Sequence, residues 1–166
     1  MSDILIILGS KSDLSITEKG LQLLKDHGQA FSLRIASAHR SPDHLHVVID
    51  EFEKNRGKIV ICVAGKSAHL AGVVASLTLK PVLAVPMYSD ATAGFDALLS
   101  MSQMPAGIPV ATMGFGDAGF VNACLTALQI FALSKQELTE QLYNYRKHQA
   151  EKVALDDKIS RVDWQC

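Results

Sequence analysis

The stretch Ile59–Ala64, with the sequence IVICVA, is an unbroken run of apolar residues. A strand that is apolar at every position has no side for solvent, which is typical of a parallel sheet covered by helices on both faces. The run ends at Gly65, and the residues that follow, Ser67–Leu79, have the apolar content of a buried helix. This segment therefore predicts a strand–helix unit of an α/β fold.

The same unit recurs on both sides of Ile59–Ala64. Four more strands are predicted, at Ile4–Leu8, Phe31–Ala36, Pro81–Val85 and Ile108–Thr112. Helices are expected at Thr17–His27, from a Ser41 cap and Pro42 onward, at Thr92–Ser102 and at Ala118–Leu133. Strands and helices that alternate in this way predict a flavodoxin-like three-layer αβα sandwich with a central parallel sheet.

A polar helical arm is expected after the sheet unit. Ser134 and Glu137 match a capping box, which predicts a helix from Ser134 to about Val153. We expect one domain over residues 1–155, including this helix, and a polar tail over residues 156–166.

The composition narrows the class of protein. The chain has 166 residues and a net charge of −1, so no overall basic field points to nucleic acid. Hydrophobic residues make up 48% of the chain, which excludes disorder, while only 6% are aromatic and 20% charged. This apolar content exceeds what one small monomer is expected to bury, so we expect part of it to form contacts between subunits.

Neither a membrane nor an oxidising compartment is expected. The most apolar helical stretches, Ser67–Leu79 and Phe120–Leu133, are shorter than the ~20 residues of a spanning helix, and no leader segment is expected. Cys62, Cys124 and Cys166 are odd in number and widely spaced, which favours reduced thiols over disulfides or a zinc site. We expect a cytoplasmic protein.

Three polar loops follow the first three predicted strands. They are Gly9–Asp13 (GSKSD), Ser37–Pro42 (SAHRSP) and Ala64–Leu70 (AGKSAHL). Ligands of a doubly wound sheet bind outside the carboxyl ends of its strands, so these loops are the place to look for a site. Small residues, hydroxyls and cations at the beginnings of helices suit an anionic ligand such as a phosphate.

Individual residues of the first two loops fit such a ligand. Gly9 permits a close backbone approach, Ser10 and Ser12 offer hydroxyl donors, and Arg40 offers a rigid fork for a phosphate. Asp13 would oppose a phosphate but suits ribose hydroxyls. The competing interpretation is that Ser12 or Asp13 only caps a helix and Arg40 is a solvated surface residue.

Two of the six histidines, His39 and His69, follow neighbouring strands and lie among small residues. Histidine titrates near physiological pH and moves protons to and from a bound ring, so the two together favour acid–base chemistry over a structural role. No triad partner, activated cysteine or cluster with metal-ligand spacing accompanies them, so neither acyl transfer nor a metal site is expected.

The segment Gly114–Gly119 (GFGDAG) formally matches the G-x-G-x-x-G dinucleotide fingerprint. That fingerprint belongs to a βαβ unit with a further strand after the helix, and here only helices are expected to follow. Dinucleotide binding is therefore disfavoured. We expect these glycines to shape a loop around the pocket or to pack against another subunit.

At its three polar loops the sequence resembles the PurE family of purine biosynthesis enzymes, over about residues 3–153. The resemblance is carried by the segments GSKSD at 9–13, SAHRSP at 37–42, AHL at 68–70 and QMPAGIPV at 103–110. It implies a flavodoxin-like fold, a homo-oligomer of eight subunits and an aminoimidazole ribonucleotide as substrate. It also implies that no metal, biotin or nucleotide cofactor takes part.

The resemblance implies roles for individual residues. The catalytic residues would be His39, which matches the acid–base histidine of the family, and His69, its second pocket histidine. In the mutase reaction a carbamate loses carbon dioxide in the closed pocket, the ring carbon captures it, and His39 moves the protons. Substrate binding would involve Gly9, Ser10, Ser12, Asp13 and Arg40 at the phosphate and ribose, and Ser37, Ala38, Gly65, Lys66, Ser67, Ala68 and Leu70 at the ring and carboxylate.

The family contains two reaction classes, and the sequence resembles both. Ala68 and His69 resemble the mutases, which rearrange N5-carboxyaminoimidazole ribonucleotide to 4-carboxyaminoimidazole ribonucleotide. Lys66-Ser67 and the loop Ser89–Gly94 are closer to the enzymes that carboxylate aminoimidazole ribonucleotide directly with carbon dioxide. Because the histidine is retained, we expect the mutase, with direct carboxylation as the alternative.

Two other classes of protein remain as alternatives. A non-catalytic phosphate-binding or signalling module of the same fold is disfavoured, because the first and third strands end in Gly9 and Ala64-Gly65 instead of acidic residues. A flavin protein is disfavoured because these loops lack aromatic residues to stack on the flavin.

Overall fold

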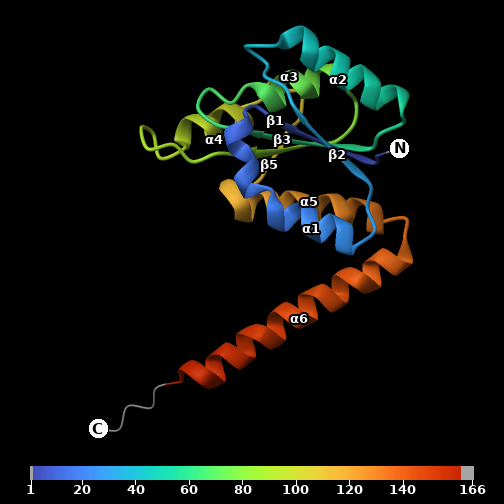
Figure 1. The fold of residues 1–166 in the computed structure, drawn as a ribbon, viewed down its shortest axis with the longest axis vertical. Helices are drawn as coiled ribbons and strands as arrows, with labels where there is room; N and C mark the ends of the chain where they lie inside the picture. The colour runs from blue at the N-terminus through green and yellow to red at the C-terminus, as the bar shows by residue number, and fades with distance from the viewer. Residues whose placement is uncertain (1, 162–166) are drawn as a thin grey trace. The chain divides into compact units, whose positions relative to one another are not determined.

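Five parallel strands form one sheet in the order β2-β1-β3-β4-β5 (Figure 1). The strands, taken from a computed structural model that describes residues 2–161, are β1 (Ile4–Leu8), β2 (Phe31–Ile35), β3 (Ile59–Ala64), β4 (Val82–Pro86) and β5 (Ala111–Thr112). This order is that of flavodoxin-like folds, so the predicted fold class is confirmed. The chain leaves β1 toward β2 on one side and returns to β3 on the other, which places the topological switch point at β1 and β3.

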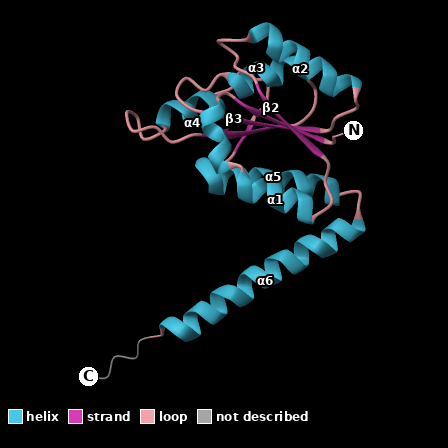
Figure 2. Cartoon of the chain, in the orientation of Figure 1, coloured by secondary structure: helices cyan, strands magenta, loops and turns pink. Residues whose placement is uncertain are grey.

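Helices cover both faces of the sheet (Figure 2). The helices of the described chain are η1 (Lys11–Ile16, a 3₁₀ helix), α1 (Glu18–Asp26), α2 (Pro42–Lys54), α3 (Leu70–Leu77), α4 (Phe95–Ser102), α5 (Gly116–Ala132) and α6 (Gln136–Ser160), the last of which is not among those that cover the sheet. Buried residues of α2, α3 and α4 share one core cluster with alternate residues of β1, β3 and β4. The other face is covered by α1 and residues 116–127 of α5 (Figure 1).

The packing of α1 against α5 depends on the glycine at position 20. A Cβ atom at Gly20 would lie 2.5 Å from the ring of Phe120, which is fully buried. The absence of a side chain at Gly20 therefore makes room for the ring, and burial of such a ring contributes about 1.5–3 kcal/mol to stability. All residues of β1, β3 and β4 are buried, as expected for a sheet covered on both faces.

Several element boundaries differ from the sequence expectation. The helix expected from Ser67 begins at Leu70, because Ser67 and His69 form a turn in which the His69 amide donates to the Ser67 carbonyl oxygen at 2.8 Å. The helix expected from Thr92 begins at Phe95, since Ala93 and Gly94 have φ values of 50° and 78°. The fifth strand shortens to Ala111–Thr112, because Pro109 has no amide for the ladder.

The described chain divides after Ala127 into two compact units. The second unit contains the end of α5 and the whole of α6. The predicted capping box at its start is wrong: α6 begins at Gln136, no side chain caps it, and the Ser134 hydroxyl instead donates to the Phe131 carbonyl oxygen at 3.3 Å. The helix continues to Ser160, past the expected end near Val153, whereas Cys166 and the rest of 162–166 lie outside the described residues. The assignment of one domain over 1–155 stays a prediction.

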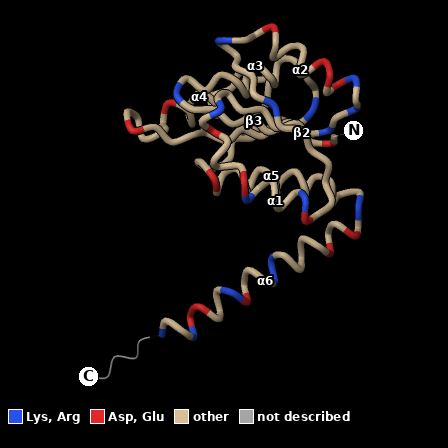
Figure 3. The backbone as a smooth tube through the Cα atoms, viewed as in Figure 1, with Lys and Arg blue, Asp and Glu red and all other residues tan. Residues whose placement is uncertain are grey.

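Acidic and basic residues are interspersed along α6 (Figure 3), whereas the charged residues of α2 are the acidic Asp43, Asp50, Glu51 and Glu53 and one base, Lys54, at its end. Within residues 2–161, no helix combines the length and apolar character needed to cross a membrane.

Candidate active site

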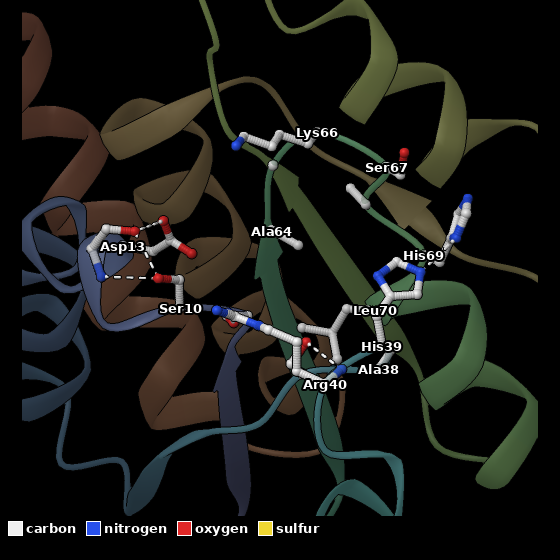
Figure 4. Close-up of a pocket in the computed structure, with 15 residues that line it drawn as sticks. Ser10, Asp13, Ala38, His39, Arg40, Ala64, Lys66, Ser67, His69 and Leu70 are labelled. Atoms are coloured by element: carbon white, nitrogen blue, oxygen red, sulfur yellow. Dashed lines mark hydrogen bonds between the residues drawn. The ribbon is translucent and has the colours of Figure 1, made fainter.

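A pocket of about 500 Å³ opens at the carboxyl ends of β1, β2 and β3 (Figure 4). Its walls are the loop from β1 to η1, the loop from β2 to α2 and the loop from β3 to α3, which the switch point brings side by side. The structure brings together here every residue that the sequence analysis assigned to a site. The lining residues are Gly9, Ser10, Ser12, Asp13, Ser37, Ala38, His39, Arg40, Ala64, Gly65, Lys66, Ser67, Ala68, His69 and Leu70.

Ala64 is the one lining residue that the site prediction missed. It is the last residue of β3 and is buried, and its carbonyl oxygen accepts a hydrogen bond from the Met87 amide at 2.9 Å. Its position at the end of a predicted strand, directly before Gly65, was the signal that could have found it.

The loop after β1 is held by its own hydroxyl groups. Ser10 is the N-cap of η1 and accepts from the Ser12 amide at 3.3 Å, so the cap is Ser10 and not Ser12 or Asp13. The Ser12 hydroxyl lies 2.9 Å from the Ser10 hydroxyl oxygen and 3.1 Å from Asp13 Oδ1. These three side chains form one polar cluster on the pocket wall.

Asp13 is the acidic residue of this wall. Partial burial raises the pKa of its carboxyl group, because the charged form loses solvation. The Ser12 hydroxyl, the Ser10 backbone and the positive charge of Arg40 oppose this effect in that order. The balance leaves a carboxyl group that is more readily protonated than an exposed aspartate.

The loop after β2 positions Arg40 beside that cluster. Its Nη2 donates to the carbonyl oxygen of Gly9 at 2.9 Å, and its amide donates to the Ser37 hydroxyl at 3.2 Å. Ser41 is the N-cap of α2, as expected, but its side chain makes no capping hydrogen bond, since its hydroxyl oxygen accepts from the Ser37 amide at 3.0 Å. Pro42 does occupy the first turn of α2, as expected.

His39 and His69 meet across the pocket. His39 Nε2 lies 2.9 Å from His69 Nδ1, and the two rings are edge to face, with centroids 5.0 Å apart and planes at 77°. Both histidines are exposed to the pocket opening. One of the two nitrogens carries a proton and the other accepts it, and the tautomers of the two rings decide which is which.

The loop after β3 combines a strained residue with an apolar floor. Lys66 has a φ of 58°, which lies in the left-handed region. This conformation is energetically unfavourable for any residue other than glycine. Ala68 and Leu70, 1% and 3% exposed, present buried apolar surface to the same pocket. In Figure 4 the Lys66 side chain extends away from His39 and His69.

Residues 2–161 contain no group of three or more His, Cys, Asp or Glu arranged to hold a metal ion. The Gly114–Gly119 segment lines no part of the pocket, which corrects the expectation that it shapes a loop there. Gly119 allows a close backbone approach, because a Cβ atom there would lie 1.7 Å from the carbonyl oxygen of Gly114. The expectation that the segment packs against another subunit stays a prediction.

Comparisons with known proteins agree on one family. The model of the AIR carboxylase family matches residues 3–152. The chain is 48% identical to an N5-carboxyaminoimidazole ribonucleotide mutase of Methanocaldococcus jannaschii, over 96% of this chain and 98% of that protein. A protein of the same name from Escherichia coli K12 is 41% identical over 89% and 88%. The crystal structure of Treponema denticola PurE superposes with a TM-score of 0.85 at 33% identity, covering 96% of this chain and 98% of that one.

Proposed function

The chain belongs to the AIR carboxylase family, and from this membership we propose that it converts N5-carboxyaminoimidazole ribonucleotide to 4-carboxyaminoimidazole ribonucleotide in purine biosynthesis. The observation that carries the proposal is the joint presence, in one pocket, of an anion-binding wall and a hydrogen-bonded histidine pair. A nucleotide substrate needs the first, and a reaction that moves protons on its ring needs the second.

The anion-binding wall and the histidine pair together orient the substrate. Arg40, Ser10 and Ser12 supply a charged fork and two hydroxyl groups for the phosphate, and Asp13 supplies a carboxylate for the ribose hydroxyls. The imidazole ring then lies toward His39 and His69. Ser37, Ala38, Gly65 and Ser67 complete this end with small side chains that leave room for a planar ring and a carboxylate.

The reaction is a transfer of one carboxyl group from the exocyclic nitrogen of the substrate to a carbon of its imidazole ring. The carbamate C–N bond breaks, carbon dioxide forms and the nitrogen takes a proton. The ring carbon then attacks the carbon dioxide, the new C–C bond forms and the ring carbon loses its proton. His39 is the group that gives the first proton and receives the second, so the exchange is balanced without a cofactor.

Retention of the carbon dioxide between these steps requires a closed, poorly hydrated space. The buried side chains of Ala68 and Leu70 supply apolar surface beside the histidines. A molecule held there reacts as if at very high concentration, whereas one that escapes makes the turnover unproductive.

Direct carboxylation of aminoimidazole ribonucleotide is not favoured, because the relatives at 40–48% identity carry the mutase name. A non-catalytic phosphate-binding module is disfavoured by the same finding and by the histidine pair, which phosphate binding alone does not require.

The proposal includes a homo-oligomer, with eight subunits as the expected number. It is supported by large apolar side chains that are exposed on the described chain. These are Leu14, Ile35, Val47, Leu79, Tyr88, Phe95, Leu99, Leu133, Tyr143, Val153, Leu155 and Ile159. Size-exclusion chromatography with light scattering tests this part: an 18.0 kDa particle at micromolar concentration would contradict it.

A cytoplasmic location is also part of the proposal. It is supported by Cys62 and Cys124, which are free and buried, as expected for a protein of a reducing compartment.

The decisive experiment supplies the purified protein with two alternative substrates. With the carbamate substrate we expect product to form faster than the carbamate breaks down by itself, and without added bicarbonate. With aminoimidazole ribonucleotide and bicarbonate we expect only a slow reaction. The opposite ratio of initial rates would assign the enzyme to direct carboxylation, and no product from either would contradict the proposed function.

A further inference from the structure

Hydrogen bonds between two serines close the loop from β2 to α2 on itself. The Ser41 hydroxyl accepts from the Ser37 amide at 3.0 Å and donates to the Ser37 carbonyl oxygen at 3.3 Å. The Ser41 amide donates to the same carbonyl oxygen at 3.0 Å. Both backbone groups of Ser37 are therefore bonded to Ser41, and the segment between the two serines is held at both ends.

The enclosed segment carries two groups that the proposed reaction needs, His39 and Arg40. The far end of each side chain has a partner, since His39 Nε2 lies 2.9 Å from His69 Nδ1 and Arg40 Nη2 donates to the Gly9 carbonyl oxygen at 2.9 Å. Both residues are exposed, so they are not fixed by packing in the core. The place of their backbone therefore depends on how the ends of the loop are tied.

Ser41 itself does not line the pocket. The lining residues of this loop run from Ser37 to Arg40, and the half-buried Ser41 lies just beyond them. Its hydroxyl group is bonded to the backbone of Ser37 instead of facing the space for a substrate. Any effect of this hydroxyl group on the reaction has to pass through the loop.

The same hydroxyl group is not used in the way that its position favours. Ser41 is the N-cap of α2, where a serine oxygen usually accepts from an amide of the first helical turn, but no such bond is present. The helix is held by its buried apolar face, which belongs to the core cluster. A hydroxyl group that leaves the helix uncapped and bonds the loop indicates that the loop is the part that needs it.

We propose that Ser41 is a positioning residue of the enzyme, which acts from outside the pocket by holding the loop that presents His39 and Arg40. This inference rests on the proposed function, since these two side chains have to meet the ring and the phosphate of one substrate molecule. It adds to the site a residue that does not touch the substrate.

Removal of the Ser41 hydroxyl takes away the acceptor of the Ser37 amide. The preceding amide, that of Ala36, donates to the Leu8 carbonyl oxygen in the sheet at 3.0 Å, whereas the Ser37 amide bonds outside the sheet. An unpaired amide at a half-buried residue favours a wider loop that admits water. A displacement of the reacting groups by about 1 Å is enough to lower turnover by about 100-fold.

The first test compares threonine with valine at position 41, because these side chains have nearly the same shape and differ in the hydroxyl group. We expect Ser41→Thr to keep kcat and KM close to those of the wild type. Ser41→Val and Ser41→Ala should lower kcat about 10- to 100-fold and also raise KM, since His39 and Arg40 move together. A smaller folded fraction alone would lower the apparent kcat and leave KM unchanged, so the joint change identifies positioning.

A matched control lies at the other end of the same helix. The Asn55 side chain donates to the Glu51 carbonyl oxygen at 2.8 Å, so Asn55→Ala also removes a side-chain bond to the backbone of α2. We expect wild-type kcat and KM for this variant. Hydrogen exchange of the Ser37 amide, followed by NMR without substrate, should be faster in Ser41→Val than in Ser41→Thr and the wild type.

Three results would overturn the role of Ser41. Wild-type kcat and KM in Ser41→Val would show that the hydroxyl group is not needed. Equal losses in Ser41→Thr and Ser41→Val would assign the effect to the size of the side chain, and equal losses in Asn55→Ala would assign it to the stability of α2. If Ser41→Ala does not fold by circular dichroism, the threonine and valine variants decide. In each case an active wild type leaves the proposed function standing, whereas an inactive wild type contradicts the function itself.

Discussion

Arg40 reaches from the loop after β2 to the end of β1, where its Nη2 donates to the Gly9 carbonyl oxygen at 2.9 Å. Because β1 and β2 are neighbours in the sheet, this bond ties together two of the three loops that line the pocket. It also fixes the guanidinium next to the hydroxyl groups of Ser10 and Ser12. The guanidinium has five N–H donors and only one of its hydrogen bonds is to Gly9, so it retains donors for an anion.

Substitution of Arg40 should therefore weaken substrate binding more than it slows the chemistry. For Arg40→Ala we expect KM to rise about 10- to 100-fold, since a hydrogen bond to a charged group contributes about 1.5–3 kcal/mol. Arg40→Lys should recover only part of this, because an ammonium group lacks the fork. Lys11→Ala, an exposed cation of η1 that does not line the pocket, is the matched control. Equal effects of Arg40→Ala and Lys11→Ala on KM would remove Arg40 from the phosphate site.

His39→Asn should abolish turnover without unfolding the pocket. An asparagine is still able to form a hydrogen bond with His69 but no longer gives or receives a proton, so we expect kcat to fall at least ~100-fold. Affinity for the product, measured by calorimetry, should stay within a few-fold of the wild type because the phosphate wall is intact. Turnover at the wild-type rate would show that the acid–base group lies elsewhere.

Asp13 should make the protein less stable as the pH rises through its titration. Burial raises the pKa of this carboxyl group in the folded state above its ordinary value of 3.8. At a pH between the ordinary pKa and the raised pKa, the folded state therefore binds more protons than the unfolded state. Stability then falls with increasing pH in that window, since the unfolded state releases the proton first. Asp13→Asn lacks this titration and should gain stability relative to the wild type from pH 4 upward.

Urea unfolding of both proteins between pH 4 and pH 7, at one protein concentration, measures that difference. We expect the stability of Asp13→Asn minus that of the wild type to increase with pH and then to level off. A difference that decreases with pH would mean that Ser12, Ser10 and Arg40 outweigh burial and lower the pKa instead.

Gly119 and Gly114 offer a matched pair of glycine substitutions within one motif. A Cβ atom at Gly119 would overlap the Gly114 carbonyl oxygen, whereas a Cβ atom at Gly114 would have nothing nearer than 4.0 Å. Gly119→Ala should cost at least 1–3 kcal/mol in unfolding free energy, the usual range for overpacking. Gly114→Ala should cost much less. Equal unfolding free energies of the two variants would contradict the conclusion that Gly119 is required for the close approach to the Gly114 backbone.

The sequence was sufficient to predict the sheet, because β1, β3 and β4 are short, wholly apolar runs with no competing helical period. It was also sufficient to place the site, since strand ends are known once the strands are known. The details that it missed depend on contacts between loops. Ser41 bonds to Ser37 across a turn, and Ala93 and Gly94 turn left-handed before α4, neither of which a local pattern encodes. The direct bond between His39 and His69 likewise exists only because two separate loops meet.

Lys66 allows its charge and its backbone to be tested separately. The residue holds a left-handed conformation at φ 58°, which glycine adopts freely and other residues adopt at a cost of about 1–2 kcal/mol. Lys66→Gly removes the charge and the strain, whereas Lys66→Ala removes the charge and keeps the strain. We expect Lys66→Gly to unfold at a higher urea concentration than Lys66→Ala, by about 0.5–1 kcal/mol after the greater flexibility of glycine is included. Both should raise KM by the same factor, about fivefold, because an exposed charge contributes on the order of 1 kcal/mol to binding an anionic substrate. If KM changed in Lys66→Gly but not in Lys66→Ala, the backbone conformation and not the ammonium group would be the feature that the substrate requires.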